Sequence, residues 1–273
     1  MKISFMTWLT PNWSLERIVK FAQRAGYDGV ELRVDVGHKH GISSKTSIEE
    51  RRVARRLFKK AGVAVSSIAT SVRFGSPSEK ERKENIELAK EYIKLAYDLD
   101  ARVIRIFGGL SSKGVIELTD EALDYIAAAF TEVGEFGADY DVCPLLEMHD
   151  AFSVRRYSSP IEASKKAFEV IRRAKTNNIG ILWNQNYLDK ESFNLLGRYI
   201  RHFHINKEEY DPEDRELFET MKLMNSIGFK GYFSLEHIRR ASLKKLLATN
   251  PEKVLEDHAK LMRKFLEKIK AQC

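Results

Sequence analysis

Hydrophobic and polar residues follow two alternating rhythms along this chain. Short runs rich in β-branched residues show the two-residue period of β-strands, and in the longer stretches between them apolar residues recur every three or four positions, as in amphipathic helices. The predicted strands begin near Lys2, Gly29, Val63, Ala101, Val142, Asn178, Tyr199 and Tyr232. The pattern therefore predicts eight strand–helix units that follow one another without a linker.

The ends of the predicted helices carry capping residues. Ser47 and Glu50 form a capping box, in which each side chain accepts a hydrogen bond from a backbone N–H of the first turn. A polar residue before proline is expected to begin three more helices, at Ser159-Pro160, Asp211-Pro212 and Asn250-Pro251. Glycine is expected to end helices in the left-handed conformation at Gly26, Gly62 and Gly228. Each unit thus reads as helix, glycine turn and strand.

The number and spacing of these units favour one α/β fold class, a single (β/α)8 TIM barrel that occupies residues 1–273 as one domain. An open, doubly wound sheet is the alternative. It is disfavoured because no predicted strand is followed by the glycine fingerprint of a dinucleotide or phosphate loop, and GGLSSKG after the fourth strand is only loosely glycine-rich. The sixth and seventh strands begin only 21 residues apart, so the helix between them is expected to be short.

The composition excludes several classes of protein. A hydrophobic fraction of 43%, with only 15 Gly and 6 Pro, excludes disordered and low-complexity chains. No run of about 18 to 20 apolar residues predicts a membrane helix, and the N-terminal segment lacks a signal-peptide core, so a cytoplasmic location is expected. The two cysteines, Cys143 and Cys273, cannot build a disulfide framework. The net charge of +7 is spread along the chain rather than gathered in a nucleic-acid-binding patch.

Chemically reactive side chains gather at the ends of the last four predicted strands, where a barrel of this kind builds its active site. Four of the seven histidines and two glutamates fall in the segments LLEMHD, LWNQNY, HFHINK and SLEHI. Side chains two positions apart share one face of a strand, so polar residues of matching parity are expected to converge inside the barrel. These residues are Glu147, Asn184, His204 and Glu236.

Two carboxylates, an imidazole and an amide oxygen form a suitable ligand shell for Mn²⁺, Mg²⁺, Co²⁺ or Zn²⁺. Each of the four residues alone is also explained as a hydrogen-bonding group of the core or as a helix cap. The four together are not, because burying several charges inside a barrel costs several kcal/mol unless another group compensates them. We therefore predict a divalent-cation site.

At these residues the sequence resembles the xylose isomerase-like TIM-barrel superfamily of sugar phosphate isomerases and epimerases. That superfamily includes ketose 3-epimerases, inosose and dehydroshikimate dehydratases, and endonuclease IV. The resemblance covers nearly the whole chain and is carried, in order, by the segments AQRAGYDGVELRVD, ARVIRIFGG, LLEMHD, HFHIN and GFKGYFSLEH.

The resemblance implies metal ligands at Glu147, His204 and Glu236. Asn184 stands where the family has Asp, which removes one negative charge from the shell although an amide oxygen can still coordinate. The Asp-x-x-His of the family is likewise replaced by NQNY at residues 184–187. The loop after the seventh strand, KEEYDPEDRELFE, lacks the Arg and Gly-rich segment with which relatives contact substrate, and Arg215 is its only arginine.

By the same resemblance, the chain is expected to be a divalent-metal-dependent isomerase or epimerase of a sugar, a sugar phosphate or a related polyol. The metal would polarise a carbonyl, and Glu147 and Glu236 would act as the acid/base pair on the neighbouring C–H through an enediolate. A dehydratase of the same superfamily begins with the same proton removal and stays an alternative. The substrate and the oligomeric state, including a homo-oligomer, are left open by the sequence.

Seven further residues near the strand ends are candidates for substrate binding. They are Trp8, Glu31, Arg105, His149, Trp183, Asn206 and Arg215. Structural roles compete with this one: a core hydrogen bond for His149, a salt bridge for Arg105, and plain packing for the two tryptophans. For Glu31 the competing role is an ion pair with Arg33 or Arg105. The histidines of VGHKHG, His38 and His40, are expected to lie in a solvated loop.

Two other function classes compete with a sugar isomerase. An endonuclease IV-like nuclease would suit the positive charge, but that family places histidines on the third and fourth strands. Here these strands read SIATSVRF and IRIFGG, without histidine, so a nucleic-acid partner is not expected. The second competitor is a non-catalytic, sugar-binding descendant, in which Asn184 would mark a weakened metal site.

Overall fold

The strands of this computed structural model carry large apolar side chains on one face and small or polar ones on the other. In β1 (Lys2–Met6), Ile3 and Phe5 are fully buried, and the ring of Phe5 meets that of Phe21 edge-on with their centroids 6.0 Å apart. Ser4 lies between them and faces the opposite way, because side chains alternate along a strand. The strongly apolar faces therefore turn outward to a layer of helices, and the faces that carry most of the polar residues turn inward.

Eight parallel strands close into a barrel, in the order β1-β10-β9-β8-β7-β4-β3-β2. The structure describes residues 1–207, 214–238, 245 and 248–272. The remaining barrel strands are β2 (Gly29–Arg33), β3 (Ala64–Arg73), β4 (Val103–Phe107), β7 (Cys143–Glu147), β8 (Gly180–Trp183), β9 (Ile200–Lys207) and β10 (Tyr232–Ile238). The predicted eight strands and the TIM-barrel fold class are confirmed, and the open doubly wound sheet is excluded.

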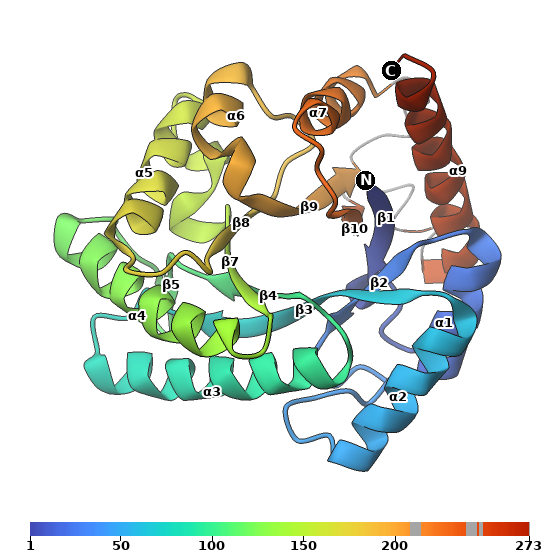
Figure 1. Cartoon of the computed structure of the whole chain (residues 1–273), viewed down its shortest axis with the longest axis horizontal. Coiled ribbons are helices and arrows are strands. Elements are labelled where there is room, and N and C mark those ends of the chain that lie inside the picture. The colour runs from blue at the N-terminus through green and yellow to red at the C-terminus, as the bar shows by residue number, and fades with distance from the viewer. Residues whose placement is uncertain (208–213, 239–244, 246–247, 273) are drawn as a thin grey trace.

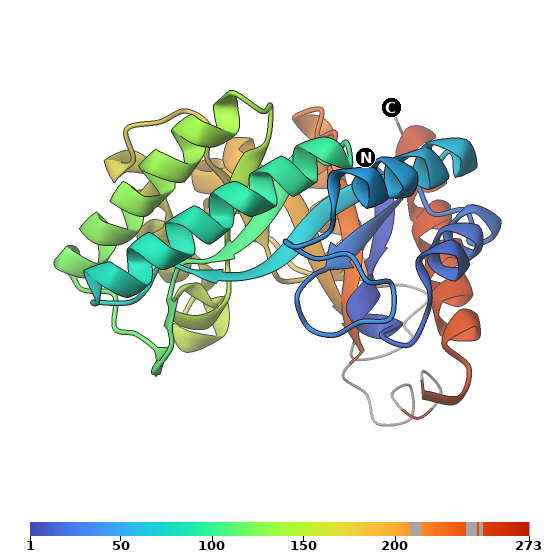
Figure 2. The ribbon, with the colours of Figure 1, turned by 90° about the horizontal axis from the view of Figure 1, so that it is seen from below.

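Eight helices among the described residues form a ring around the barrel (Figure 1). They are α1 (Leu15–Ala25), α2 (Ile48–Ala61), α3 (Glu79–Asp98), α4 (Asp120–Ala138), α5 (Pro160–Arg173), α6 (Lys190–Leu196), α7 (Arg215–Ser226) and α9 (Pro251–Lys270). Figure 2 shows this layer from the side, with α3 and α4 next to each other along one half of the barrel. Helix α6 has only seven residues, as the short strand spacing predicted. No helix in the described part of the chain combines the length and apolar character needed to cross a membrane.

The predicted helix boundaries are confirmed where the structure describes them. Ser47 caps α2 in a capping box with Glu50, and Asn250 caps α9 just before Pro251. Helix α5 begins at Pro160. Three predicted glycines follow helix ends with positive φ angles: Gly26 (77°), Gly62 (67°) and Gly228 (70°). The predicted start at Asp211-Pro212 lies outside the described residues, and the cap of α7 is Asp214.

After β4, the GGLSSKG segment forms a short hairpin that the sequence pattern did not predict. Strand β5 (Leu110–Ser111) pairs antiparallel with β6 (Gly114–Val115). Gly109 lets this segment approach the loop after β7, because a Cβ atom on it would lie only 2.4 Å from the Cβ of Ala151. The glycines therefore permit close packing of two loops beside the barrel mouth.

A separate apolar cluster of Val103, Leu145 and Leu182 fills part of the barrel interior. Each of these residues lies two positions before a polar residue of the same strand or strand end, and so shares its inward face. Those polar residues are Arg105, Glu147 and Asn184. The inward polar groups therefore pack against a layer of apolar side chains on the side of the amino ends of the strands, which shields them from water there.

The loop after β2 differs from the expected solvated loop in one respect, because His40 is buried. Its Nε2 lies 3.1 Å from the carbonyl oxygen of Arg33, and its Nδ1 accepts a hydrogen bond from the N–H of Ile42 at 3.1 Å. The imidazole thus donates on one side and accepts on the other, which requires its neutral form. Burial, followed by the neighbouring His38, lowers the pKa of His40 to about 4.

We expect this histidine to make the protein less stable in mild acid. The unfolded chain binds a proton at His40 below about pH 6.5, whereas the folded chain does so only near pH 4. The free energy of unfolding should therefore fall as the pH drops through this window, by up to about 3 kcal/mol from this group. Urea unfolding at pH 7 and pH 4.5 measures the change. His40→Gln should reduce this pH dependence, and an unchanged dependence would contradict the assignment.

Candidate active site

Seven polar side chains meet inside the barrel, from the inward faces of β2, β4, β7, β9 and β10 and from the residue that follows β8. They are Glu31, Arg105, Glu147, Asn184, His202, His204 and Glu236, and each is at most 5% exposed. The four residues predicted to converge are thus brought together, although they are far apart along the chain. Parallel strands of a closed barrel explain this meeting, because their carboxyl ends all lie at one end of the barrel.

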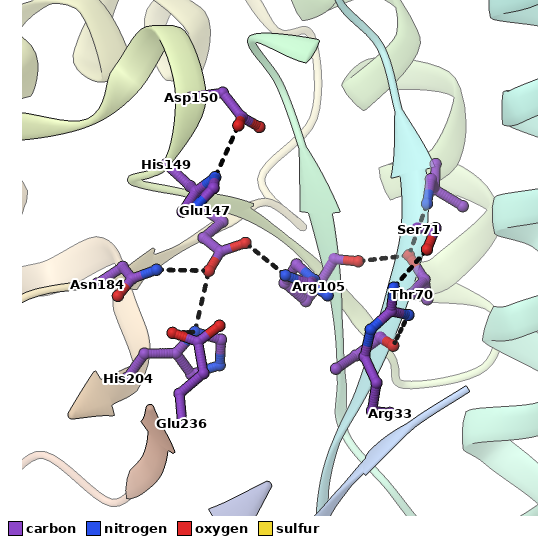
Figure 3. A network of polar contacts seen from close by, with 12 residues as sticks. Arg33, Thr70, Ser71, Arg105, Glu147, His149, Asp150, Asn184, His204 and Glu236 are labelled. Atoms are coloured by element: carbon purple, nitrogen blue, oxygen red, sulfur yellow. Dashed lines mark hydrogen bonds and ion pairs between the residues drawn. The ribbon is translucent and has the colours of Figure 1, made fainter. Parts of the chain in front are cut away.

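The carboxylate of Glu147 lies at the centre of this cluster (Figure 3). Its Oε1 accepts a hydrogen bond from Asn184 Nδ2 at 2.8 Å and also lies 2.9 Å from His204 Nδ1. Its Oε2 accepts a hydrogen bond from Arg105 at 2.8 Å. Burial alone would raise the pKa of Glu147, but the Arg105 guanidinium and the His204 imidazole hold it below its usual range. Glu147 is therefore ionised. Arg105 forms an ion pair with it, which is the structural role that the sequence offered for Arg105 as an alternative to substrate binding.

His204 lies among three carboxylates. Its Nδ1 is 2.9 Å from Glu147 Oε1 and 3.3 Å from Glu236 Oε2, and its Nε2 is 3.0 Å from Glu31 Oε1. Burial alone would lower the pKa of this imidazole, but the surrounding carboxylates raise it well above its usual value. The cluster thus uses a proton on His204 to offset its negative charge, and a bound divalent cation would offset the same charge.

Glu31 does not pair with Arg33 or Arg105, the partners considered from the sequence. Its carboxylate instead contacts both histidines of β9, with Oε2 3.0 Å from His202 Nε2 and Oε1 3.0 Å from His204 Nε2. Arg33 turns away and donates to Ser71 Oγ and to backbone carbonyl groups. Barrel closure explains this pairing. It places β2 and β9 across the interior from each other, although 173 residues separate Glu31 from His204.

Asn184 presents its amide nitrogen, rather than its oxygen, to Glu147. Its Nδ2 donates to Glu147, and its Oδ1 accepts a hydrogen bond from Asn206 Nδ2 at 2.6 Å. The backbone N–H of Asn206 donates a hydrogen bond to Asn186 Oδ1, which is 3.0 Å away. In this arrangement both Asn184 and Asn206 hold the cluster in place, and Asn184 must rotate its amide to offer an oxygen to a cation.

Two groups of three side chains in the described residues could hold a metal ion. One is Glu147, His204 and Glu236, and the other is Glu31, His202 and His204. In each group the ligand atoms lie within 4.8 Å of one another, close to the span of donor atoms around an ion bound at about 2.0–2.2 Å. Glu236 Oε2 is buried and forms no hydrogen bond among the described residues, although it lies 3.3 Å from His204 Nδ1, so this oxygen is available as a ligand. The donor set therefore fits a divalent ion.

Two of the other predicted substrate-binding residues, His149 and Arg215, are exposed. His149 follows β7 and is exposed, and its Nδ1 lies 2.8 Å from Asp150 Oδ1. Burial would lower the pKa of His149, but Asp150 and then Glu147 raise it. Arg215 is exposed at the first residue of α7. The structure thus brings His149 close to the charged cluster, whereas Arg215 stays in solvent.

Trp183 does not form an apolar wall for a substrate. It is fully buried in the outer core, and its Nε1 donates to the carbonyl oxygen of Tyr187 at 3.0 Å. Because Trp183 and Asn184 are adjacent in an extended segment, they face opposite ways, so an inward Asn184 places the tryptophan among the helices. The prediction for Trp183 is therefore corrected to packing.

Trp8 lies at the barrel mouth in an aromatic group that the sequence did not single out. It follows β1, is 46% exposed, and its ring centroid is 6.4 Å from that of His237 and 5.9 Å from that of His38. His237 in turn has Nε2 3.7 Å from Glu236 Oε1. The histidines of VGHKHG and SLEHI were visible in the sequence, but the approach of His38 and His237 to one tryptophan depends on how the loops fold.

Fold and site together define a class of protein: a TIM barrel whose strands carry a buried centre of carboxylates and imidazoles that suits a divalent cation. The chain belongs to the xylose isomerase-like TIM-barrel family, whose sequence model matches residues 19–265. The resemblance inferred from the segments around Glu147, His204 and Glu236 is thereby confirmed.

Comparison with individual proteins adds one sequence relative and many similar folds. The chain is 24% identical over 204 residues to the uncharacterized protein MJ1311 of Methanocaldococcus jannaschii, which covers 66% of this chain and 68% of that protein. The structure resembles the IolI protein crystallised with a zinc atom (TM-score 0.73, 17% identity, 98% and 99% of the two chains covered). It also resembles D-psicose 3-epimerase from Clostridium cellulolyticum H10, crystallised with D-tagatose (0.72, 13%, 99% and 99%).

A third similar structure is the probable 3-DHS dehydratase AsbF from Bacillus anthracis (TM-score 0.70, 18% identity, 96% and 99% of the two chains covered). At such low sequence identities these likenesses concern the fold. They place an epimerase and a probable dehydratase on one backbone architecture, so the chemistry of this chain must be argued from its own residues.

Proposed function

We propose that this chain is a divalent-metal-dependent isomerase or epimerase that removes a proton next to the carbonyl of a sugar, a sugar phosphate or a related polyol. The proposal is supported by family membership and by the likeness to the fold of D-psicose 3-epimerase. Its main support is one geometric observation: the carboxylates of Glu147 and Glu236 approach the same atom, His204 Nδ1, at 2.9 and 3.3 Å. Two carboxylates that face one point can take and return a proton on a substrate bound between them.

A divalent cation held by Glu147, His204 and Glu236, with Asn184 after rotation of its amide, would polarise the carbonyl and acidify the neighbouring C–H. Glu236 suits the role of proton acceptor, because its buried Oε2 forms no hydrogen bond among the described residues and only lies 3.3 Å from His204 Nδ1. Three donors hold Glu147 ionised, so Glu147 could return a proton only after taking one up. We assign proton removal to Glu236, and the opposite-face step to Glu147 once it is protonated.

The substrate would lie above this cluster, at the carboxyl ends of the strands. Trp8 and His237 offer an aromatic edge at the mouth, which can pack against the apolar face of a sugar. His149, beside Asp150, offers a nitrogen that can donate to a substrate oxygen. Arg105, buried inside the barrel and bonded to Glu147, acts as a positioning residue for Glu147 rather than as a substrate ligand.

A dehydratase is the second candidate, because loss of a β-hydroxyl group can follow the same proton removal. A screen of ketoses, sugar phosphates, inososes and dehydroshikimate in D₂O with Mn²⁺ distinguishes the two. Deuterium at the carbon next to the carbonyl, in a product of unchanged composition, is expected for an isomerase or epimerase. Net loss of water from the substrate would instead favour the dehydratase. No exchange and no product across the whole panel would favour a non-catalytic, sugar-binding protein.

A further inference from the structure

Glu31, His202 and His204 form a second polar group, of which the proposed reaction uses only His204. All three side chains are fully buried. Glu31 Oε2 lies 3.0 Å from His202 Nε2, and Glu31 Oε1 lies 3.0 Å from His204 Nε2, so two imidazoles face one carboxylate. Donor atoms around one tetrahedral ion bound at about 2.0–2.1 Å lie ~3.3 Å apart, so small side-chain shifts suffice to seat a cation there.

This inner group lies deeper in the barrel than the group that faces the mouth. His202 precedes His204 by two residues on β9, so it shares the inward face but lies nearer the amino end of the strand. His204 uses Nδ1 toward Glu147 and Glu236, and uses Nε2 toward Glu31. The two nitrogens of one imidazole therefore point at two different groups of ligands.

The two groups differ in their donor chemistry. The inner group offers two imidazole nitrogens and one carboxylate, and the outer group of Glu147, His204 and Glu236 offers one nitrogen and two carboxylates. Imidazole suits Zn²⁺, whereas carboxylate oxygens suit Mg²⁺ and Mn²⁺. An ion that prefers nitrogen ligands should therefore bind more tightly to the inner group than to the outer group.

Charge limits the cluster to one divalent cation at a time. Its three carboxylates and the single guanidinium of Arg105 leave two negative charges, which one divalent cation neutralises. A second divalent cation would leave two positive charges in a buried site and would have to share His204 with the first. Such an excess of buried charge is unfavourable.

We propose that Glu31, His202 and His204 form an inner Zn²⁺ subsite, whose occupation excludes a cation from the outer group. The inference rests on the proposed function only in that both subsites share His204. Zn²⁺ in the inner subsite would withdraw His204 from the outer group and so prevent activation by Mn²⁺. The two subsites would then make the protein sensitive to the ratio of these two metals.

X-ray absorption at the zinc edge tests this directly on the wild-type chain loaded with one equivalent of Zn²⁺. The number of imidazole ligands is the decisive quantity, because the inner subsite supplies two and the outer group supplies one. Two imidazoles are expected. A zinc ion with one imidazole would overturn the proposal, and so would failure of the chain to bind Zn²⁺.

Matched variants provide a second readout that does not depend on activity. Zn²⁺ affinity, measured by competition with a chromophoric chelator, is expected to fall at least tenfold in His202→Gln and in Glu31→Gln, and to change less in Glu236→Gln. Mn²⁺ affinity should show the opposite order. Circular dichroism checks that each variant folds, and the wild-type absorption spectrum decides alone if one does not. If Zn²⁺ affinity falls only in Glu236→Gln, the inner group is a hydrogen-bonded network without a cation.

Different results would contradict the proposed isomerase and the proposed inner zinc subsite. Absence of deuterium exchange with Mn²⁺ across the substrate panel would remove the proposed isomerase, yet leave a two-imidazole zinc site intact. Exchange with Mn²⁺ together with a one-imidazole zinc site would keep the isomerase and remove the inner subsite.

Discussion

Glu236→Gln is expected to lower kcat/KM for proton exchange by about 10³-fold while the chain stays folded. Glutamine has nearly the same shape but cannot accept the proton, and general-base groups of this kind contribute about 10² to 10⁴-fold to the rate. The effect should appear mainly in kcat, because the substrate still finds the same pocket. Kinetics of deuterium exchange with the best substrate of the panel, at saturating Mn²⁺, measure it.

Glu135→Gln provides the matched control for this substitution. Glu135 is an exposed residue of α4, outside the barrel, so the same chemical change there should leave kcat/KM within about twofold. The metal affinity of Glu236→Gln is measured alongside, since a lost ligand and a lost base would both reduce the rate. Near-normal exchange by metal-loaded Glu236→Gln would remove Glu236 from the reaction.

Arg105→Met is expected to destabilise the metal-free protein by about 3 kcal/mol, the cost typical of leaving one charge of a buried pair without its partner. Arg105 and Glu147 are 4% and 0% exposed and lie 2.8 Å apart, so solvent cannot screen the carboxylate that remains. Methionine keeps much of the length and the apolar character of the arginine stem. Urea unfolding of the metal-free variant and of the wild type gives the difference.

The double variant Arg105→Met, Glu147→Gln separates charge from packing. It removes both members of the pair, so most of the lost stability should return. A single variant that unfolds within about 1 kcal/mol of the wild type would show that Asn184 and His204 compensate Glu147 without the guanidinium. A double variant as unstable as the single one would assign the loss to the packing of Arg105 on Phe107, whose ring centroid is 4.1 Å from the guanidinium carbon.

Strand parity explains why much of the fold and the outer group could be predicted from the sequence. Eight two-residue patterns separated by helical ones leave few arrangements other than a closed barrel, and the closed order of strands agrees. Within it, residues such as Glu147 and His204 must face inward, because their neighbours Leu146 and Phe203 belong to the outer core. The same parity rule, applied to Trp183, would have placed its side chain outside.

Contacts across the barrel could not be predicted in this way. The choice of the β9 histidines rather than an arginine as partners of Glu31 depends on which inward side chains meet across the closed interior, and no local pattern records it. The orientation of the Asn184 amide depends similarly on Asn206, and the burial of His40 on the path of its loop. Side-chain pairing and loop course are tertiary properties, so they become visible only with the structure.

In the proposed reaction, the buried cluster removes a proton next to a carbonyl with the help of one divalent cation. Deuterium exchange into the best substrate, followed before EDTA treatment, after it, and after Mn²⁺ is restored, tests this most directly. Exchange should disappear with the metal and return when Mn²⁺ is added. Exchange that continues undiminished in the metal-free protein would show that proton removal needs no divalent cation.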